Sequence, residues 1–204
     1  MPVALVTDST ASLPAELAAA RGITVVPLQV VIGATTYDEG SDGATPEMLA
    51  QALQEYLPVS TSRPNPDEML EVYERLAAGG ATEIVSVHLS SDLSGTYESA
   101  LLAAGRASIP VVAVDSRQVG VAIAFAVLAA ADAIDAGASA EEAAEEARAR
   151  AARTDALFYV DTLEYLRRGG RVGAAAALLG SALAVKPILQ VADGRVVPKE
   201  RVRT

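Results

Sequence analysis

The chain of 204 residues is 51% hydrophobic but only 4% aromatic, which predicts a globular protein with a large core of small aliphatic side chains. Acidic residues outnumber basic residues by 26 to 16, and the net charge of −10 argues against nucleic acid as a partner. The sequence has no cysteine, which excludes disulfides and thiolate metal sites, and its start MPVALVTDST lacks the layout of a secretory signal, so we expect a cytoplasmic protein.

Strand-like and helix-like segments alternate along the first three quarters of the chain. Short runs rich in Val, Ile and Leu are typical of strands, and a Ser, Thr or Asn followed by Pro and an acidic residue is typical of a helix start. In chain order, the sequence predicts a strand at 2–6, a helix at 15–21, one or two strands within 23–32, a helix from 45, a helix at 66–78, a strand at 84–89, a helix at 95–106, a strand at 109–114 and a helix at 141–154. This β-loop-α order predicts a parallel sheet.

The longest apolar stretch, residues 119–131, predicts a buried helix. It is shorter than the roughly 20 residues that a membrane-spanning helix needs, and Asp132 and Asp135 follow it closely. We therefore expect no stable insertion into a membrane.

The pattern changes near Thr154. Residues 157–160, 187–191 and 195–197 are strand-like, and Asp193-Gly194 between the last two predicts a hairpin turn. The expected fold is α/β, with an α/β/α lobe that holds a parallel sheet over residues 1–153 and the start of a second, mainly antiparallel α+β lobe over residues 154–204.

Three polar turns each lie just ahead of a predicted helix: Asp8-Ser9-Thr10, Thr61-Ser62 within a hydroxyl- and proline-rich loop predicted over 59–66, and Ser91 to Gly95. Loops at the carboxyl ends of strands in an open α/β sheet converge on one crevice. Free backbone N–H groups and hydroxyls at a helix start bind a carboxylate or a phosphate. The same residue types also cap helices without any ligand, so the residues alone do not identify an anion.

His88 is the single histidine of the chain. With Ser94 and Asp115 it could form a hydrolytic triad, although no G-x-S-x-G motif surrounds the serine, and a lone histidine among apolar strand residues is more often a hydrogen-bonded core residue. The sequence predicts no metal site, and it has neither a Walker loop nor a dinucleotide fingerprint.

A basic turn, Arg167-Arg168-Gly169-Gly170-Arg171, allows two interpretations. It is either a clamp for an anionic group or an acidic partner, or a helix end with arginines on its last turn.

Six motifs occur in a characteristic order: VTDSTASLP, VVPLQV, TSRPNP, HLSSDLSGTYESA, VDTLEYLRRGGRVG and KPIL. This series resembles the DegV family of fatty-acid-binding proteins over almost the whole chain. The resemblance implies a two-lobed protein with an acyl chain in an apolar tunnel between the lobes and its carboxylate bound by hydroxyls. The residues that it implies are Thr61 and Ser94 as the main donors, Ser62 and the Gly95 amide as supporting donors, and Asp8 and Ser9 as further residues of the crevice.

The resemblance also implies a role without catalytic residues or a cofactor. The ligand would be a palmitate-, stearate- or oleate-like fatty acid, offered to a separate ATP-dependent fatty acid kinase that makes acyl-phosphate for phospholipid synthesis. Arg203 would contact the phosphorylated head group or the kinase. Family members run some tens of residues further, with a histidine near the head group, so the second lobe is expected to be truncated at Thr204.

Two other functions remain open at the level of sequence. One is a small hydrolase or phosphotransferase that uses Ser94 and His88. The other is a structural fragment that binds no ligand.

Overall fold

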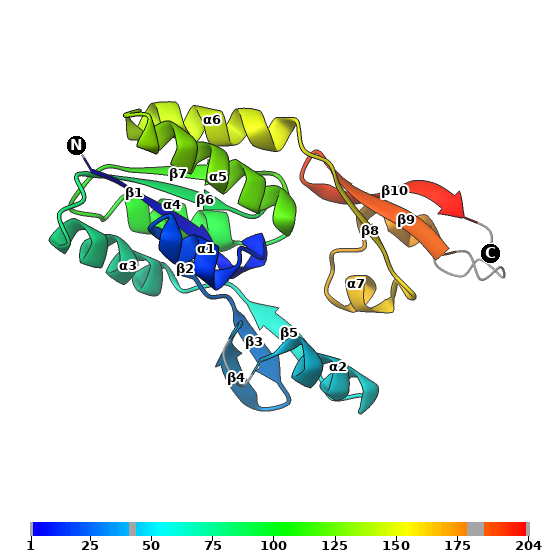
Figure 1. Cartoon of the computed structure of the whole chain (residues 1–204). Helices are drawn as coiled ribbons and strands as arrows, with labels where there is room; N and C mark the ends of the chain where they lie inside the picture. Colours follow the sequence, from blue (N-terminus) through cyan, green and yellow to red (C-terminus); the bar gives the residue numbers. More distant parts are fainter. Residues whose placement is uncertain (1, 41–43, 179–185, 203–204) are drawn as a thin grey trace.

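A parallel sheet forms the centre of the larger part of the molecule (Figure 1). The computed structural model describes residues 2–40, 44–178 and 186–202. The sheet has four strands in the order β2-β1-β6-β7, and all neighbours run parallel. The strands are β1 (Val3–Asp8), β2 (Ile23–Val26), β6 (Glu83–His88) and β7 (Val111–Asp115). The predicted parallel sheet is therefore confirmed.

Helices cover both faces of this sheet, which explains why β1 and β6 are buried along most of their length. One face packs against α3 (Pro66–Ala78) and α4 (Thr96–Ala104). The other face packs against α1 (Ala15–Ala20), α5 (Val121–Asp135) and α6 (Ala140–Ala152). The segment predicted as a buried apolar helix is α5.

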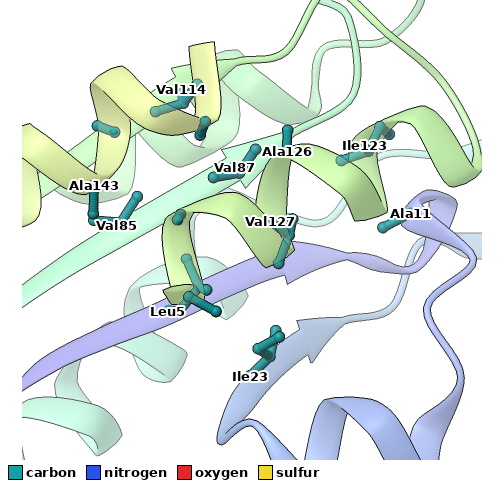
Figure 2. Packing of buried hydrophobic residues seen from close by; sticks show 14 of the residues in the cluster. Leu5, Ala11, Ile23, Val85, Val87, Val114, Ile123, Ala126, Val127 and Ala143 are labelled. Carbon is teal, nitrogen blue, oxygen red and sulfur yellow. The ribbon is translucent and has the colours of Figure 1, made fainter. Parts of the chain in front are cut away.

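The core between the sheet and the second helical layer is built from aliphatic strand residues and helix alanines (Figure 2). Val85 and Val87 of β6 pack in one cluster with Ile123 and Val127 of α5. Where α5 and α6 meet, their buried residues are mainly alanines. Small side chains let two helices approach closely, which is how a chain with few aromatic residues fills its core.

Local capping signals determine where two of the helices begin. The Asn65 side chain accepts a hydrogen bond from the Asp67 N–H, the Glu68 carboxylate accepts one from the Asn65 N–H, and Pro66 occupies the first turn of α3. Ser139 and Glu142 form the equivalent capping box of α6. The helix predicted over 66–78 is confirmed at both ends.

A small antiparallel sheet interrupts the α/β order between β2 and β6. It has the order β4-β3-β5, with β3 (Gln29–Ile32), β4 (Thr35–Asp38) and β5 (Val59–Ser62), and α2 (Pro46–Gln54) lies between β4 and β5 in the chain. The sequence predicts a loop over 59–66. This prediction was wrong for the first four residues, which form β5. These residues gain a regular partner because β5 pairs with β3, and no local pattern reveals that distant pairing.

The third sheet, of order β10-β9-β8, lies beyond α6 and is antiparallel. Its strands are β8 (Ala156–Tyr159), β9 (Lys186–Ala192) and β10 (Arg195–Val202), and α7 (Glu164–Arg168) follows β8. Asp193 and Gly194 have φ values of 50° and 80°, as a two-residue type I′ hairpin requires, so the predicted turn is confirmed. The fold class, α/β with a parallel sheet plus antiparallel sheets, is confirmed as well.

The chain changes from one sheet system to another between α6 and β8, which are separated by three residues, 153–155. We propose to divide the chain there into a first lobe, residues 1–153, and a second lobe, residues 154–204. None of the helices in the described residues combines the length and apolar character needed to cross a membrane.

Candidate functional site

The order of the parallel strands creates a crevice between β1 and β6. The chain leaves β1 toward β2 on one side and later returns to β6 on the other side, so the connections at the carboxyl ends of these two strands diverge. Ligands of open α/β sheets bind at such a point. The short 3-10 helix Ser9–Ala11 follows β1, and a polar turn follows β6 and leads into α4.

A cavity of about 650 Å3 lies at this crevice, within the ~300–1,000 Å3 typical of small-molecule sites. Thr10 follows β1, Thr61 belongs to β5 of the small sheet, and Ser94 belongs to the turn before α4; all three line the cavity. The two hydroxyl residues that the motifs single out, Thr61 and Ser94, are thus brought to one cavity from a strand of the small sheet and from the turn before α4.

Most of the remaining wall is apolar and comes from both lobes. The first lobe contributes Leu89, Leu93, Val119 and the α5 residues Val121, Ala122 and Phe125, and the second contributes Ala156, Leu157, Phe158, Leu166 and Val196. The exposed fractions of Val121, Phe125 and Leu157 are 55%, 51% and 52%. The cavity is therefore open to solvent along part of an apolar wall.

Thr61 and Ser94 are differently placed for binding an anion. The Ser94 and Thr96 hydroxyl oxygens are 2.9 Å apart, at the N-terminus of α4, where backbone N–H groups lack helical partners. The Thr61 hydroxyl has no hydrogen-bond partner within the described part of the chain. The Ser94 hydroxyl is thus engaged beside a helix start, whereas the Thr61 hydroxyl is not engaged by any described residue.

The two residues expected as supporting donors have different surroundings. Ser62 follows Thr61 on β5, so its side chain points to the opposite face of the small sheet, and it is absent from the described wall of the cavity. Gly95 is the residue that precedes α4, and the side chain of Arg63 lies against it.

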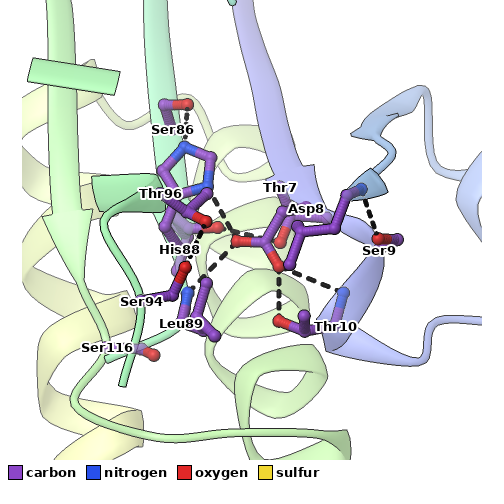
Figure 3. Close-up of polar contacts among 12 residues, drawn as sticks. Thr7, Asp8, Ser9, Thr10, Ser86, His88, Leu89, Ser94, Thr96 and Ser116 are labelled. Carbon is purple, nitrogen blue, oxygen red and sulfur yellow. Dashed lines mark hydrogen bonds and ion pairs between the residues drawn. The ribbon is translucent and has the colours of Figure 1, made fainter. Parts of the chain in front are cut away.

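Asp8 lies behind the cavity wall and is fully buried (Figure 3). One carboxylate oxygen accepts hydrogen bonds from the backbone N–H of Thr10, at 3.1 Å, and from its hydroxyl. The other accepts from His88 Nδ1 at 2.9 Å and from the Leu89 N–H at 3.2 Å. Thr10 and Leu89 line the cavity, so Asp8 positions wall residues and does not itself face the cavity.

Ser9 also acts through its neighbours. Its hydroxyl donates to a Glu39 carboxylate oxygen at 2.5 Å and accepts from the Leu28 N–H at 2.9 Å. Glu39 and Leu28 line the cavity, whereas Ser9 is not among the residues of its described wall. The hydrogen bonds of Ser9 therefore join the first lobe's β1 turn to the small sheet.

His88 is a buried core residue whose two ring nitrogens are both engaged. Nε2 lies 2.7 Å from the Ser86 hydroxyl, which accepts a hydrogen bond from the Tyr73 hydroxyl at 2.9 Å. If the imidazole donates from Nδ1 to Asp8 and accepts at Nε2 from the Ser86 hydroxyl, every hydrogen bond from Tyr73 through Ser86 and His88 to Asp8 has one donor and one acceptor. Burial raises the pKa of Tyr73 to about 12, and its hydrogen bond to Ser86 acts in the opposite direction.

The geometry gives no support to a Ser94-His88-Asp115 triad. The His88 nitrogens face Asp8 and Ser86, and the Asp115 carboxylate accepts hydrogen bonds from Ser91 and from the Arg117 N–H. The sequence-based interpretation of His88 as a hydrogen-bonded core residue is the one that the structure bears out.

The basic turn divides into a structural part and a part at the cavity. Arg167 and Arg168 lie on the last turn of α7 and both bind Glu164, whose pKa their hydrogen bonds lower to about 2. Arg171 lines the cavity, and its Nε donates to the Leu93 carbonyl at 2.9 Å. The helix-end interpretation thus holds for the first two arginines. Arg203 lies outside the described residues.

The parallel sheet, the two antiparallel sheets and the mainly apolar cavity define the class as an α/β protein that combines a parallel sheet with antiparallel sheets. The chain belongs to the DegV family, because the family model described as "Uncharacterised protein, DegV family" matches residues 2–204. A DegV domain-containing protein of Streptomyces coelicolor is 55% identical over 99% of this chain and 72% of its own length.

Solved structures show the same fold. A fatty-acid-binding DegV family protein from Thermus thermophilus superposes with a TM-score of 0.92 at 37% identity, covering 100% of this chain and 72% of that one. DegV, a fatty acid binding protein from Bacillus subtilis, gives a TM-score of 0.88 at 37% identity over 100% and 73% of the two chains. The family resemblance carried by the sequence motifs is therefore confirmed.

Proposed function

We propose that this chain is a cytoplasmic carrier that binds a long-chain fatty acid and presents it to a separate ATP-dependent fatty acid kinase, without catalysing a reaction itself. The acyl chain lies against the apolar wall of the cavity, and the hydroxyls of Thr61 and Ser94 hold the carboxylate. The kinase then phosphorylates the carboxylate for phospholipid synthesis.

The observation that carries this proposal is the joint presence of Thr61 and Ser94 on one cavity whose other walls are mainly apolar. A ligand that fits such a cavity needs a long apolar part and one polar end. The solved relatives named as fatty-acid-binding proteins support the same ligand class.

The energetics favour a fatty acid over a small polar acid. Burial of an acyl chain contributes about 0.8 kcal/mol per methylene. An unpaired buried carboxylate costs several kcal/mol, which hydroxyl donors and the N–H groups at the start of α4 offset. Neutral donors also leave the carboxylate oxygens able to react when a kinase approaches.

Mass spectrometry of the denatured protein after expression in bacteria tests the proposal. We expect about one long-chain fatty acid per chain in the native protein and strong depletion in the Thr61→Ala, Ser94→Ala double variant. Ser60→Ala is the matched control, because Ser60 also belongs to β5 but points away from the Thr61 face. Equal occupancy of all three proteins would refute the assigned carboxylate site.

The proposed transfer to a kinase needs a second experiment. Protein loaded with radiolabelled palmitate is mixed with a bacterial fatty acid kinase and ATP, and acyl-phosphate is trapped with hydroxylamine. We expect hydroxamate only when the kinase and ATP are both present. Hydroxamate formed without the kinase would show that the chain has a catalytic activity of its own.

A further inference from the structure

Arg63 joins the two segments that carry the hydroxyl residues. It directly follows β5, two residues after Thr61, and its Nη1 donates a hydrogen bond to the Gly95 carbonyl at 3.2 Å. Gly95 itself directly follows Ser94. The Arg63 side chain therefore spans from the small sheet to the start of α4.

The contact between Arg63 and Gly95 depends on the absence of a side chain at Gly95. A Cβ at that position would lie 2.1 Å from Arg63 Nη1 and 2.8 Å from its Cδ. The φ of Gly95 is −77°, which any residue adopts, so the backbone conformation does not require glycine here. A side chain at this position would instead have to displace Arg63 from its contact.

Arg63 places a positive charge close to the Ser94 turn, although it is not itself a residue of the described cavity wall. Arg63 forms no ion pair with any described residue. Arg171, which does line the cavity, likewise donates to backbone carbonyls, those of Leu93 and Gly169. Glu39 contributes a negative charge to the cavity wall, in a chain with a net charge of −10. An anionic ligand therefore needs a local positive charge, and Arg63 and Arg171 can both supply one.

We propose that Arg63 is a positioning and charge-selecting residue of the carboxylate site: it ties the Thr61 strand to the Ser94-Gly95 turn and makes the site favour an ionised acid over a neutral lipid. The inference rests on the proposed function, because it concerns the same carboxylate. It assigns to the arginine between the serine and the proline of the TSRP motif a role that the two hydroxyls do not have.

Equilibrium binding of radiolabelled palmitate and of methyl palmitate to delipidated protein tests the charge. Arg63→Met should weaken palmitate binding by about 5- to 20-fold, leave methyl palmitate binding within about twofold, and reduce the salt dependence of palmitate binding. Arg63→Lys should recover part of the affinity and most of the salt dependence. Arg106→Met is the control, since Arg106 follows the opposite end of α4 and pairs with Asp67 at the surface.

A double-mutant cycle tests the positioning role. Gly95→Ala should weaken palmitate binding in the native background because the new methyl group displaces Arg63. The Arg63→Ala background removes the three atoms nearest to the new methyl group, so the same change should have little further effect. Unfolding of all four proteins is followed in parallel, so that any general loss of stability is separated from the coupling.

The outcomes distinguish this inference from the proposed function. Native protein that binds neither palmitate nor its ester would overturn the proposed function. Native protein that binds palmitate, together with an Arg63→Met variant of unchanged affinity and salt dependence, would overturn only the role of Arg63. Additive effects in the cycle would overturn the positioning part.

Discussion

The Ser90 hydroxyl donates a 2.7 Å hydrogen bond to the carbonyl of Gly194, at the tip of the β9-β10 hairpin. This contact docks the second lobe onto the turn that follows β6. A Cβ at Gly194 would lie 2.6 Å from Ser90 Oγ and 3.1 Å from an Asp92 carboxylate oxygen, and the φ of Gly194 is +80°. Both the turn and the docking contact therefore depend on this glycine.

Gly194→Ala should lower the free energy of unfolding by about 1–3 kcal/mol through backbone strain and the clash with Ser90. Gly137→Ala is the control, because Gly137 has a φ of +93° with no atom within 4 Å of a new Cβ, so only the backbone term applies. Chemical denaturation of both variants measures the difference. Equal losses would mean that the docking contact adds nothing to stability.

The raised pKa of Tyr73 should make the folded protein less stable at high pH. Its pKa is raised to about 12, above the ordinary value of 10, so the folded protein retains this proton more strongly than the unfolded chain does. The stabilisation, about 2–3 kcal/mol, is fully present below pH 10 and is lost as the pH rises from 10 to 12. Denaturation of the native protein and of Tyr73→Phe across this range should show a steeper loss for the native protein. Parallel curves would contradict the assignment.

Asp8→Asn should destabilise the first lobe and disturb the cavity wall. The carboxylate accepts four hydrogen bonds, and an amide presents an N–H group to two of those donors. We expect a loss of about 2–4 kcal/mol in unfolding free energy and weaker palmitate binding. Asp67→Asn, at an exposed ion pair, is the control and should change neither. Native-like stability of Asp8→Asn would show that the network contributes little.

The apolar wall can be tested without disturbing the core. Phe125 and Leu102 both lie on helix surfaces, with exposed fractions of 51% and 59%, but only Phe125 lines the described cavity. Phe125→Asp should therefore abolish the co-purification of fatty acid, because it places a charge beside the acyl chain. Leu102→Asp should leave the lipid content unchanged. Similar lipid content in the two variants would place the acyl chain elsewhere.

Local signals in the sequence were sufficient for much of the fold. The capping residues Asn65 and Glu68 identified the start of α3, and Asp193-Gly194 identified the hairpin of the second lobe. The strand β5 was missed because its regular structure comes from pairing with β3, far away in the sequence. Strand preference depends on such tertiary partners more than helix capping does.

The candidate site was less accessible to sequence reasoning. Polar turns indicated an anion site in general terms, and only the family resemblance singled out Thr61 and Ser94. The buried Asp8 carboxylate depends on donors from β6 and from the segments that follow β1 and β6, and the approach of Arg63 to Gly95 depends on the placement of the small sheet. The resemblance singled out the glycine of the SGT motif only for its amide, and the space that it leaves for Arg63 is visible only in the structure.

The alanines between α5 and α6 affect the position of the cavity wall on the opposite face of α5. Ala126 and Ala130 are buried toward the core, while Val121 and Phe125 of the same helix form the apolar wall. Close packing on the buried face of α5 fixes where the opposite face of the same helix lies, and so contributes to the width of the cavity. In the proposed carrier, the alanines of α5 and α6 would therefore help to set how much room the cavity offers to an acyl chain.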